Sequence, residues 1–305
     1  MPPAPVDSMR PSGRPSPALV LGLSLVGISF AAPLVRLSTA HPVAIAAWRL
    51  GFSLLIVAIA LAISGQWQQL RRLGRRDIAV ASAAGVMLAL HFWSWNTSVG
   101  LTTVAASVVL VNLQPVFVAL FSARWLGEPP GRRQWLGIAL ALAGAGVVAA
   151  AGFTDIVAAG HRPLLGNLLA VVGAITAAVY YVIGRGLRKT IDLWAYVGVV
   201  YGACFVALLA IAAIWRVPLT PQPPRDLAIF AGLAIGPMLL GHTGMNYALR
   251  YLPAYVVNLT VLGEPVGATL LAAIIPGIAE VPTASTLVGG GLILGGVILA
   301  ARRGG

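Results

Sequence analysis

Long apolar stretches, separated by short polar ones, dominate this chain of 305 residues. Only 9% of the residues are charged and the mean hydropathy is +0.91, whereas a soluble domain carries about 25% charged residues. Because lipid offers the backbone no hydrogen-bonding partners, each stretch of about 20 apolar residues predicts a membrane-spanning α-helix. We therefore expect an all-α polytopic membrane protein whose main surroundings are the lipid bilayer. Ten such stretches occur, at residues 18–37, 42–64, 78–97, 101–124, 133–153, 164–184, 193–215, 227–249, 253–276 and 283–301.

The sequence features that many enzymes and nucleic-acid-binding proteins use are scarce. The single cysteine, Cys204, permits no intramolecular disulfide, and no HExxH, GxGxxG or Walker-type motif occurs. The net charge of +12 comes from short basic clusters between the apolar stretches, which is the pattern of loops that flank membrane helices. These observations predict a protein with no cofactor, no metal site and no nucleic-acid partner.

Basic residues are unequally divided between the two sides of the expected bundle. Residues 1–17 are rich in Pro and Ser and are predicted to form a disordered cytoplasmic tail. With this orientation, fifteen Lys and Arg residues lie on the cytoplasmic side and four on the outer side. Loops rich in Lys and Arg stay in the cytoplasm, so both termini are predicted to be cytoplasmic.

The two halves of the chain, 18–153 and 164–301, resemble each other. Shifts of 150 and 152 residues superpose polar, proline and glycine positions of one half on those of the other. Each half contains five predicted helices, and because five is odd the second half enters the membrane from the opposite side. Such inverted-topology repeats are common in secondary transporters, which use them to face either side in turn. The superposed pairs are Asn96/Asn246, Gln114/Glu264, Pro115/Pro265, Glu128/Glu280, Gly137/Gly289 and Gly144/Gly296.

Three motifs within this arrangement are typical of one transporter family. They are WRLGFSLL at 48–55, LGE at 126–128 and GEPVGATLLAA at 263–273. Over nearly the whole chain past residue 17, the sequence resembles the EamA-type branch of the drug/metabolite transporter superfamily, and within it the aromatic amino-acid exporters. The resemblance implies a bacterial inner-membrane protein with ten helices around a central cavity, exporting small metabolites from the cytoplasm. The two repeats differ at one position, because the second half has Val200 near the place that would match Arg49. Whatever role Arg49 has is therefore not repeated in the second half.

Glu264 lies in the middle of the ninth apolar stretch, where a carboxyl group is costly. Pro265 loosens the helix beside it, and Gly263 and Gly267 allow a neighbouring helix to approach closely. Glu264 could bind a substrate amine or carry a coupling proton, or it could instead hold a helix bend through hydrogen bonds. Its repeat mate Gln114 cannot ionise, which argues against a symmetric proton relay.

Arg49 lies well inside the second apolar stretch, beside Trp48. It could neutralise a substrate carboxylate. The sequence favours the other interpretation, in which Arg49 is a structural cation that pairs with backbone carbonyls or extends to the membrane interface.

Histidine and aromatic side chains recur at helical spacing in the third and eighth stretches. His91 and Trp95 are four residues apart and share a helix face, and His242 and Asn246 repeat this spacing. Because such polar groups are expensive in lipid, their faces are predicted to point inward, to bind and stack on a substrate or to hydrogen-bond between helices. The predicted substrate-binding residues are His91, Trp95, Asn96, Asn112, Gln114, Tyr180, Tyr181, His242, Asn246, Asn258 and Glu264.

The expected function is export of small metabolites, with aromatic and other apolar amino acids as the best match, by alternating access in a monomer. The family resemblance and the polar positions together assign the cavity lining to predicted helices 1, 3, 4, 6, 8 and 9. An alternative is export of cationic drugs, polyamines or nucleotide sugars, for which Glu264 or Arg49 alone would supply the opposite charge. An integral membrane enzyme acting on lipid is a further alternative, but His91 and His242 have no obvious acidic partner. The chain is therefore not expected to be an enzyme.

Overall fold

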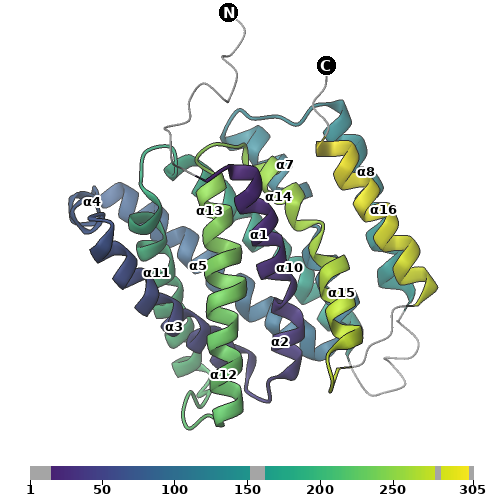
Figure 1. Cartoon of the computed structure of the whole chain (residues 1–305), viewed down its shortest axis with the longest axis horizontal. Coiled ribbons are helices and arrows are strands. Elements are labelled where there is room, and N and C mark those ends of the chain that lie inside the picture. The colour runs from purple at the N-terminus through teal and green to yellow at the C-terminus, as the bar shows by residue number, and fades with distance from the viewer. Residues whose placement is uncertain (1–14, 152–161, 279–282, 302–305) are drawn as a thin grey trace, which may run out of the picture.

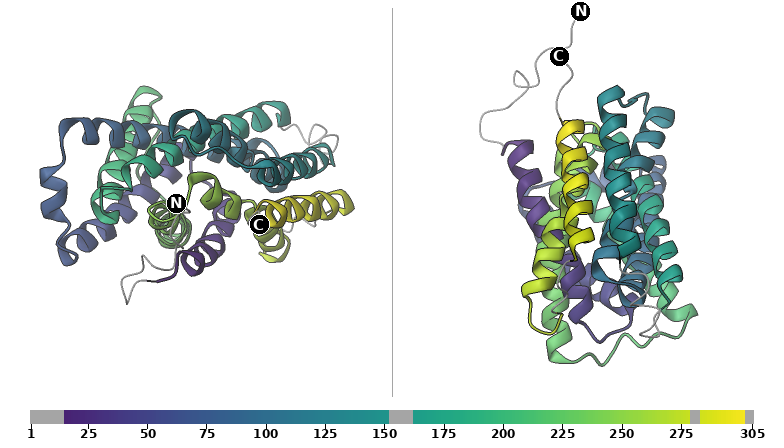
Figure 2. Two further views of the ribbon diagram at one scale, coloured as in Figure 1. Left: turned by 90° about the horizontal axis from the view of Figure 1, so that it is seen from above. Right: turned by 90° about the vertical axis from the view of Figure 1, so that its right-hand side faces the viewer.

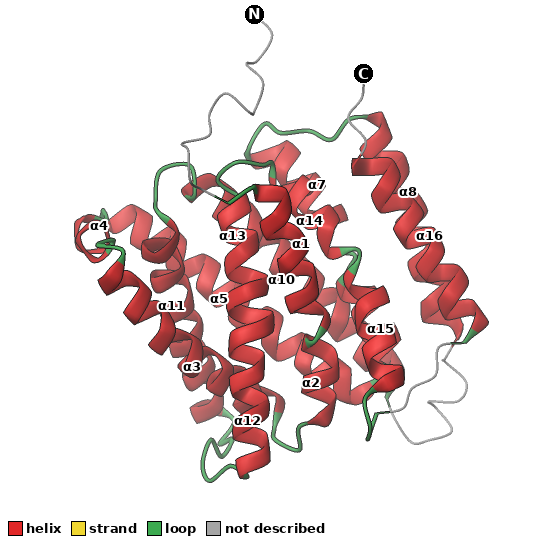
Figure 3. Ribbon diagram, viewed as in Figure 1, coloured by secondary structure: helices red, strands yellow, loops and turns green. Residues whose placement is uncertain are grey.

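The computed structural model of the protein describes residues 15–151, 162–278 and 283–301. Every element within these residues is a helix, as Figure 3 shows. Residues 1–14 of the predicted tail and Glu280 lie outside the described residues. The helices are α1 (Pro17–Ser29), α2 (Ala31–Leu37), α3 (Pro42–Ile63), α4 (Trp67–Arg72), α5 (Arg75–Leu101), α6 (Val104–Val111), α7 (Gln114–Trp125), α8 (Arg132–Ala151), α10 (Pro163–Leu187), α11 (Leu193–Ile214), α12 (Pro224–Leu233), the π-helix η2 (Ala234–Thr243), α13 (Gly244–Ala248), α14 (Ala254–Val261), α15 (Glu264–Ile274) and α16 (Ala284–Ala301).

Eight segments of the described chain are long and apolar enough to cross a membrane. The prediction of an all-helical, polytopic membrane protein is thereby confirmed. The other two predicted spans correspond to α8 and α16, which form helices but are not among the eight; the apolar part of α16 is the shorter stretch Leu287–Gly296. A count of ten spans therefore stays a prediction. The eight segments are Pro17–Leu37, Pro42–Ile63, Arg75–Leu101, Ala106–Trp125, Pro163–Leu187, Leu193–Ile214, Pro224–Ala248 and Ala254–Ile274.

Helix ends follow local sequence signals. At the start of α3 the His41 side chain accepts a hydrogen bond from the Val43 N–H, and Pro42 occupies a position that needs no N–H donor. The predicted spans 78–97 and 101–124 are separated later than expected, because α5 continues as a regular helix to Leu101. The Thr103 side chain then caps α6.

The fourth and ninth predicted spans are each divided into two helices. The division between α6 and α7 lies at Asn112 and that between α14 and α15 at Leu262; Figure 3 shows the second as a short green segment. Pro115 and Pro265 stand in the first turns of α7 and α15, where the missing proline N–H interrupts the helical hydrogen-bond ladder. Each break therefore leaves helix ends and polar side chains inside the bundle.

Glycines allow neighbouring helices to cross at close range. A Cβ atom added to Gly85 of α5 would lie 2.4 Å from the carbonyl oxygen of Val200 on α11. A Cβ atom added to Gly144 of α8 would lie 2.5 Å from the carbonyl oxygen of Gly289 on α16. These are the close approaches that small residues permit in membrane bundles.

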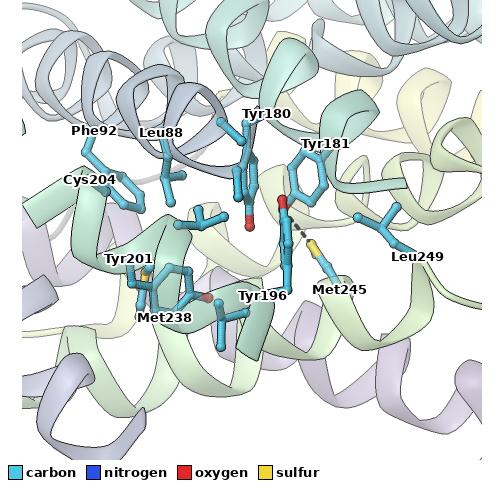
Figure 4. Packing of buried hydrophobic residues seen from close by; sticks show 14 of the residues in the cluster. Leu88, Phe92, Tyr180, Tyr181, Tyr196, Tyr201, Cys204, Met238, Met245 and Leu249 are labelled. Atoms are coloured by element: carbon cyan, nitrogen blue, oxygen red, sulfur yellow. Dashed lines mark hydrogen bonds between the residues drawn. The ribbon is translucent and has the colours of Figure 1, made fainter. Parts of the chain in front are cut away.

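The bundle is elongated when seen along its helices. Figure 2 shows α8 and α16 at one end of the long dimension and α3, α4 and α11 at the other. The first turn of α1 and the last turn of α16 lie on the same side of the bundle in Figure 1. The main core lies between α5, α10, α11 and η2, where Figure 4 shows buried tyrosines packed against methionines.

Cys204 of α11 is fully buried in this core. We expect a membrane-permeant maleimide to label Cys204 only after the protein is unfolded, because reaction requires access to the thiol. Mass spectrometry of detergent-purified protein with and without denaturant measures this, with Cys204→Ser as the background. Rapid labelling of the native protein would contradict the described packing.

Candidate functional site

A cavity of ≈ 30 Å³ lies inside the bundle between the broken helices. Its lining includes residues from all six of the helices predicted to line it, and the second predicted helix contributes as well. This volume is far smaller than the about 300–1,000 Å³ of typical small-molecule sites. The described conformation is therefore closed around the site. The lining residues are Ile28, Ala31, Arg49, His91, Trp95, Val111, Asn112, Gln114, Tyr181, Pro237, His242, Met245, Val261 and Glu264.

The helix breaks bring a carboxyl group and three carboxamides together. Asn112 Nδ2 donates to Glu264 Oε2 at 3.3 Å and to the Val108 carbonyl oxygen at 2.8 Å. Gln114 Nε2 donates to Asn258 Oδ1 at 2.7 Å. These two interhelical bonds join the α6–α7 break to α14 and to the first residue of α15. Glu264 therefore forms the interhelical hydrogen bond that the sequence left open, and it also lines the cavity.

Small residues beside Glu264 let α1 pack closely over it. An added Cβ would lie 2.8 Å from Leu25 Cδ2 at Gly263 and 2.2 Å from Ser29 Oγ at Gly267. The prediction that this GxxxG pair permits a close helix approach is confirmed, and α1 is the helix that approaches.

Aromatic rings form a second wall of the cavity. His91 and Trp95 are stacked, with ring centroids 6.1 Å apart and ring planes 3° from parallel. His91 Nδ1 lies 2.9 Å from the Gly173 carbonyl oxygen, and because a carbonyl only accepts, Nδ1 carries the proton in this bond. The Tyr181 hydroxyl lies 3.3 Å from His242 Nδ1 and 3.0 Å from Met245 Sδ.

Seven of the predicted site residues line the cavity and four do not. Asn96 instead donates to the Pro42 carbonyl oxygen, and Asn258 accepts from Gln114. Asn246 donates to the Tyr180 hydroxyl and to the His242 carbonyl oxygen. Helical spacing brought these residues to the bundle interior, but each forms a hydrogen bond to another helix and does not line the cavity. The seven are His91, Trp95, Asn112, Gln114, Tyr181, His242 and Glu264.

Arg49 also lines the cavity, although sequence reasoning favoured a structural role. Its side chain is 1% exposed and its guanidinium carbon lies 4.3 Å from the centre of the Phe92 ring. Nε and Nη2 have no hydrogen-bond partner among the described residues. Arg49 therefore neither extends to the interface nor satisfies these two atoms with backbone carbonyls.

One end of the bundle is held together by ion pairs. Arg185 at the end of α10 forms an ion pair of 3.0 Å with Glu128, which Lys189 also contacts at 3.4 Å. Arg185 Nη1 also donates to the carbonyl oxygen of Leu249 after α13 at 2.8 Å. These contacts of Arg185 tie the α7–α8 loop to α10 and α13.

Buried polar contacts hold the opposite end. The Thr39 hydroxyl donates to Asp226 of α12 at 2.7 Å. Trp48 Nε1 donates to the Leu219 carbonyl oxygen at 2.8 Å. The cavity thus lies between two sets of interhelical contacts.

No group of three or more metal-binding side chains occurs in the described part of the chain.

The family model described as "EamA-like transporter family" matches residues 17–150 and 164–302. The chain belongs to the EamA-like transporter family. This membership agrees with the resemblance found in the motifs, and it makes the protein a member of a family of multi-pass membrane transporters.

Relatives of this EamA chain include proteins named as exporters. It is 29% identical over 262 residues to the probable terminal-alkyne amino-acid exporter of Streptantibioticus cattleyicolor, covering 82% of each chain. It is 27% identical over 238 residues to the pseudopaline exporter CntI of Pseudomonas aeruginosa, covering 75% of this chain and 77% of CntI. A solved crystal structure superposes with a TM-score of 0.70 at 21% identity, covering 94% of this chain and 98% of the other, and shows the same fold.

Proposed function

We propose that this EamA chain exports amino acids with aromatic or other apolar side chains by alternating access. The observation that carries this proposal is the cavity itself, which combines the Glu264 carboxyl group and two carboxamides with the His91–Trp95 stack. The carboxyl and carboxamide groups suit the charged end of an amino acid, and the stacked rings suit its side chain. The relative named as an amino-acid exporter supports this substrate class over drugs or nucleotide sugars.

Alternating access by two inverted halves, 18–153 and 164–301, is the proposed mechanism. A feature of α8 and α16 supports it. A Cβ on Gly296 would lie 2.4 Å from the Gly137 carbonyl oxygen, which mirrors the approach of Gly144 to Gly289. The repeat alignment pairs Gly137 with Gly289 and Gly144 with Gly296, so it converts each of these two contacts into the other. The two helices run antiparallel, as helices related by an inverting twofold axis do. On this proposal α8 and α16 are the fifth and tenth spans.

We propose a bacterial inner-membrane location, with both termini in the cytoplasm and a single chain as the working unit. The end that carries Glu128, Arg185 and Lys189 is then the cytoplasmic end. Opening of these contacts admits substrate, and opening of the opposite end releases it. The cavity must widen in each case because its volume of ≈ 30 Å³ is far below the about 300–1,000 Å³ of small-molecule sites.

Flux measurements in proteoliposomes test the proposal. Purified protein is reconstituted and the movement of labelled Phe, Trp, Thr and Met is followed with and without an imposed pH gradient. Protein-dependent flux that grows with the gradient identifies a proton-coupled exporter, and flux independent of the gradient identifies a facilitator. Absence of flux for all four amino acids would refute the proposed substrate class.

Replacing Trp95 with alanine is expected to reduce the preference for aromatic substrates. The loss of one aromatic contact lowers affinity for Phe by about 2- to 10-fold relative to Thr, because ring pairs contribute about 0.5–1.5 kcal/mol. Competition of unlabelled Phe and Thr against labelled Met measures the two affinities. Equal losses for Phe and Thr would show that Trp95 acts in packing rather than in side-chain recognition.

A further inference from the structure

Arg49 is a buried cation that lines the cavity and has N–H groups without hydrogen-bond acceptors. Its side chain is 1% exposed, and Nε and Nη2 lack acceptors among the described residues. Burial of an unmatched guanidinium costs free energy, and folded proteins leave few buried polar groups unpaired. The other fully buried arginine, Arg188, differs, because it donates to the carbonyl oxygens of Asn246 and Ile191.

We propose that Arg49 binds the carboxylate of the transported amino acid, while Glu264 binds its ammonium group. This assignment rests on the proposed function and adds the orientation of the substrate within the site. A guanidinium presents its N–H groups in a planar fork that matches the two oxygens of a carboxylate. A bound carboxylate would therefore supply the acceptors that Nε and Nη2 lack.

Arg49 and Glu264 line the same cavity without forming a contact pair. Among the described residues, no ion pair within 4.0 Å joins them, and the Glu264 carboxyl group is bonded to Asn112 instead. A guanidinium and a carboxyl group that face one small space are complementary to a zwitterion, whose ammonium group favours the ionised form of the carboxyl group. A cation without a carboxylate would leave Arg49 unpaired, so the same arrangement disfavours polyamines and cationic drugs.

Phe92 holds the guanidinium at this place. The Arg49 guanidinium carbon lies 4.3 Å from the Phe92 ring centre, a cation–π contact that fixes the side chain but offers no hydrogen-bond acceptor. The second repeat has Val200 near the place that matches Arg49, and among the described residues that line the cavity Arg49 of α3 is the one Arg or Lys. The substrate is therefore oriented with its carboxylate toward α3 and its ammonium group toward α15.

Isothermal titration calorimetry of detergent-purified protein tests this assignment with three ligands. Phenylalanine carries both charges, phenylalaninamide lacks the carboxylate and 3-phenylpropionate lacks the ammonium group. Arg49→Gln is expected to weaken phenylalanine binding by about 10- to 100-fold, as for loss of a charged hydrogen bond, and to leave phenylalaninamide binding unchanged. Arg49→Lys retains the charge but not the fork, and we expect an intermediate loss for phenylalanine alone.

Arg188→Gln is the matched control, because it removes a buried guanidinium outside the cavity. We expect Arg188→Gln to change the affinities for phenylalanine and phenylalaninamide by the same factor. If Arg49→Gln and Arg49→Lys also weaken both ligands alike, or weaken neither, Arg49 is structural and the assignment is overturned. Arg49→Lys decides the question if Arg49→Gln does not fold. A wild-type protein that binds none of the three ligands would instead refute the proposed function, before any variant is measured.

Discussion

Replacing Glu264 with glutamine is expected to reduce amino-acid transport by about 10- to 100-fold, the effect of removing a hydrogen bond to a charged group. Among the described residues that line the cavity, Glu264 is the one carboxyl group. Glutamine has nearly the same shape, and its side-chain oxygen can still accept the Asn112 N–H that Glu264 accepts at 3.3 Å. The fold is therefore retained while the negative charge is lost. Initial rates of labelled Phe flux in proteoliposomes measure the effect.

Asp77→Asn is the control for this change, because Asp77 lies in the first turn of α5, fourteen residues from His91 and about 21 Å along the helix. A loss confined to experiments with an imposed pH gradient would assign proton coupling to Glu264. A loss both with and without the gradient would assign it to substrate binding. Unchanged flux under both conditions would leave Glu264 with the structural bond to Asn112 alone.

Replacing Gly85 with alanine is expected to destabilise the folded protein by about 1–3 kcal/mol, the usual cost of forcing a methyl group into a packed interior. The added methyl would lie 2.4 Å from the Val200 carbonyl oxygen and 3.0 Å from the Cys204 amide nitrogen. Both are backbone atoms of α11, so relief requires that the whole helix move away from α5. Thermal unfolding followed by tryptophan fluorescence measures the lowered midpoint.

Gly100→Ala is the matched control for Gly85→Ala, because both positions lie on α5. A Cβ at Gly100 would meet nothing within 4 Å, so alanine there should leave the midpoint unchanged or raise it slightly through its better helix propensity. Equal midpoints for the two variants would contradict the described crossing of α5 and α11.

The spans could be predicted closely because each must satisfy its own backbone in lipid. The second predicted span, 42–64, differs from α3 by one residue at its end, since Pro42 and the cap before it mark the start. The same reasoning identified Pro115 and Pro265, which do stand at the helix breaks. Local chemistry was sufficient for these features.

Contacts between distant residues could not be predicted in this way. The bond between Asn112 and Glu264 joins residues 152 positions apart, and helical periodicity contains no information about which helices face each other. The π-helix η2 also escaped prediction, because Pro237 indicates a disturbed helix but not its hydrogen-bond register. Arg49 lacks hydrogen-bond acceptors because none of the described helices around it places an acceptor near Nε or Nη2. This property depends on the packed bundle and cannot be predicted from the sequence.

The small volume of the cavity also matters for the membrane around the protein. A space of ≈ 30 Å³, with the Glu128–Arg185 contacts at one end of the bundle and the Thr39–Asp226 contacts at the other, is far smaller than a water-filled channel. Ions and protons then meet the dielectric barrier of the bilayer core rather than a pore. A cell could therefore carry many idle copies without discharging its membrane potential, and would lose stored energy only when a carrier turns over.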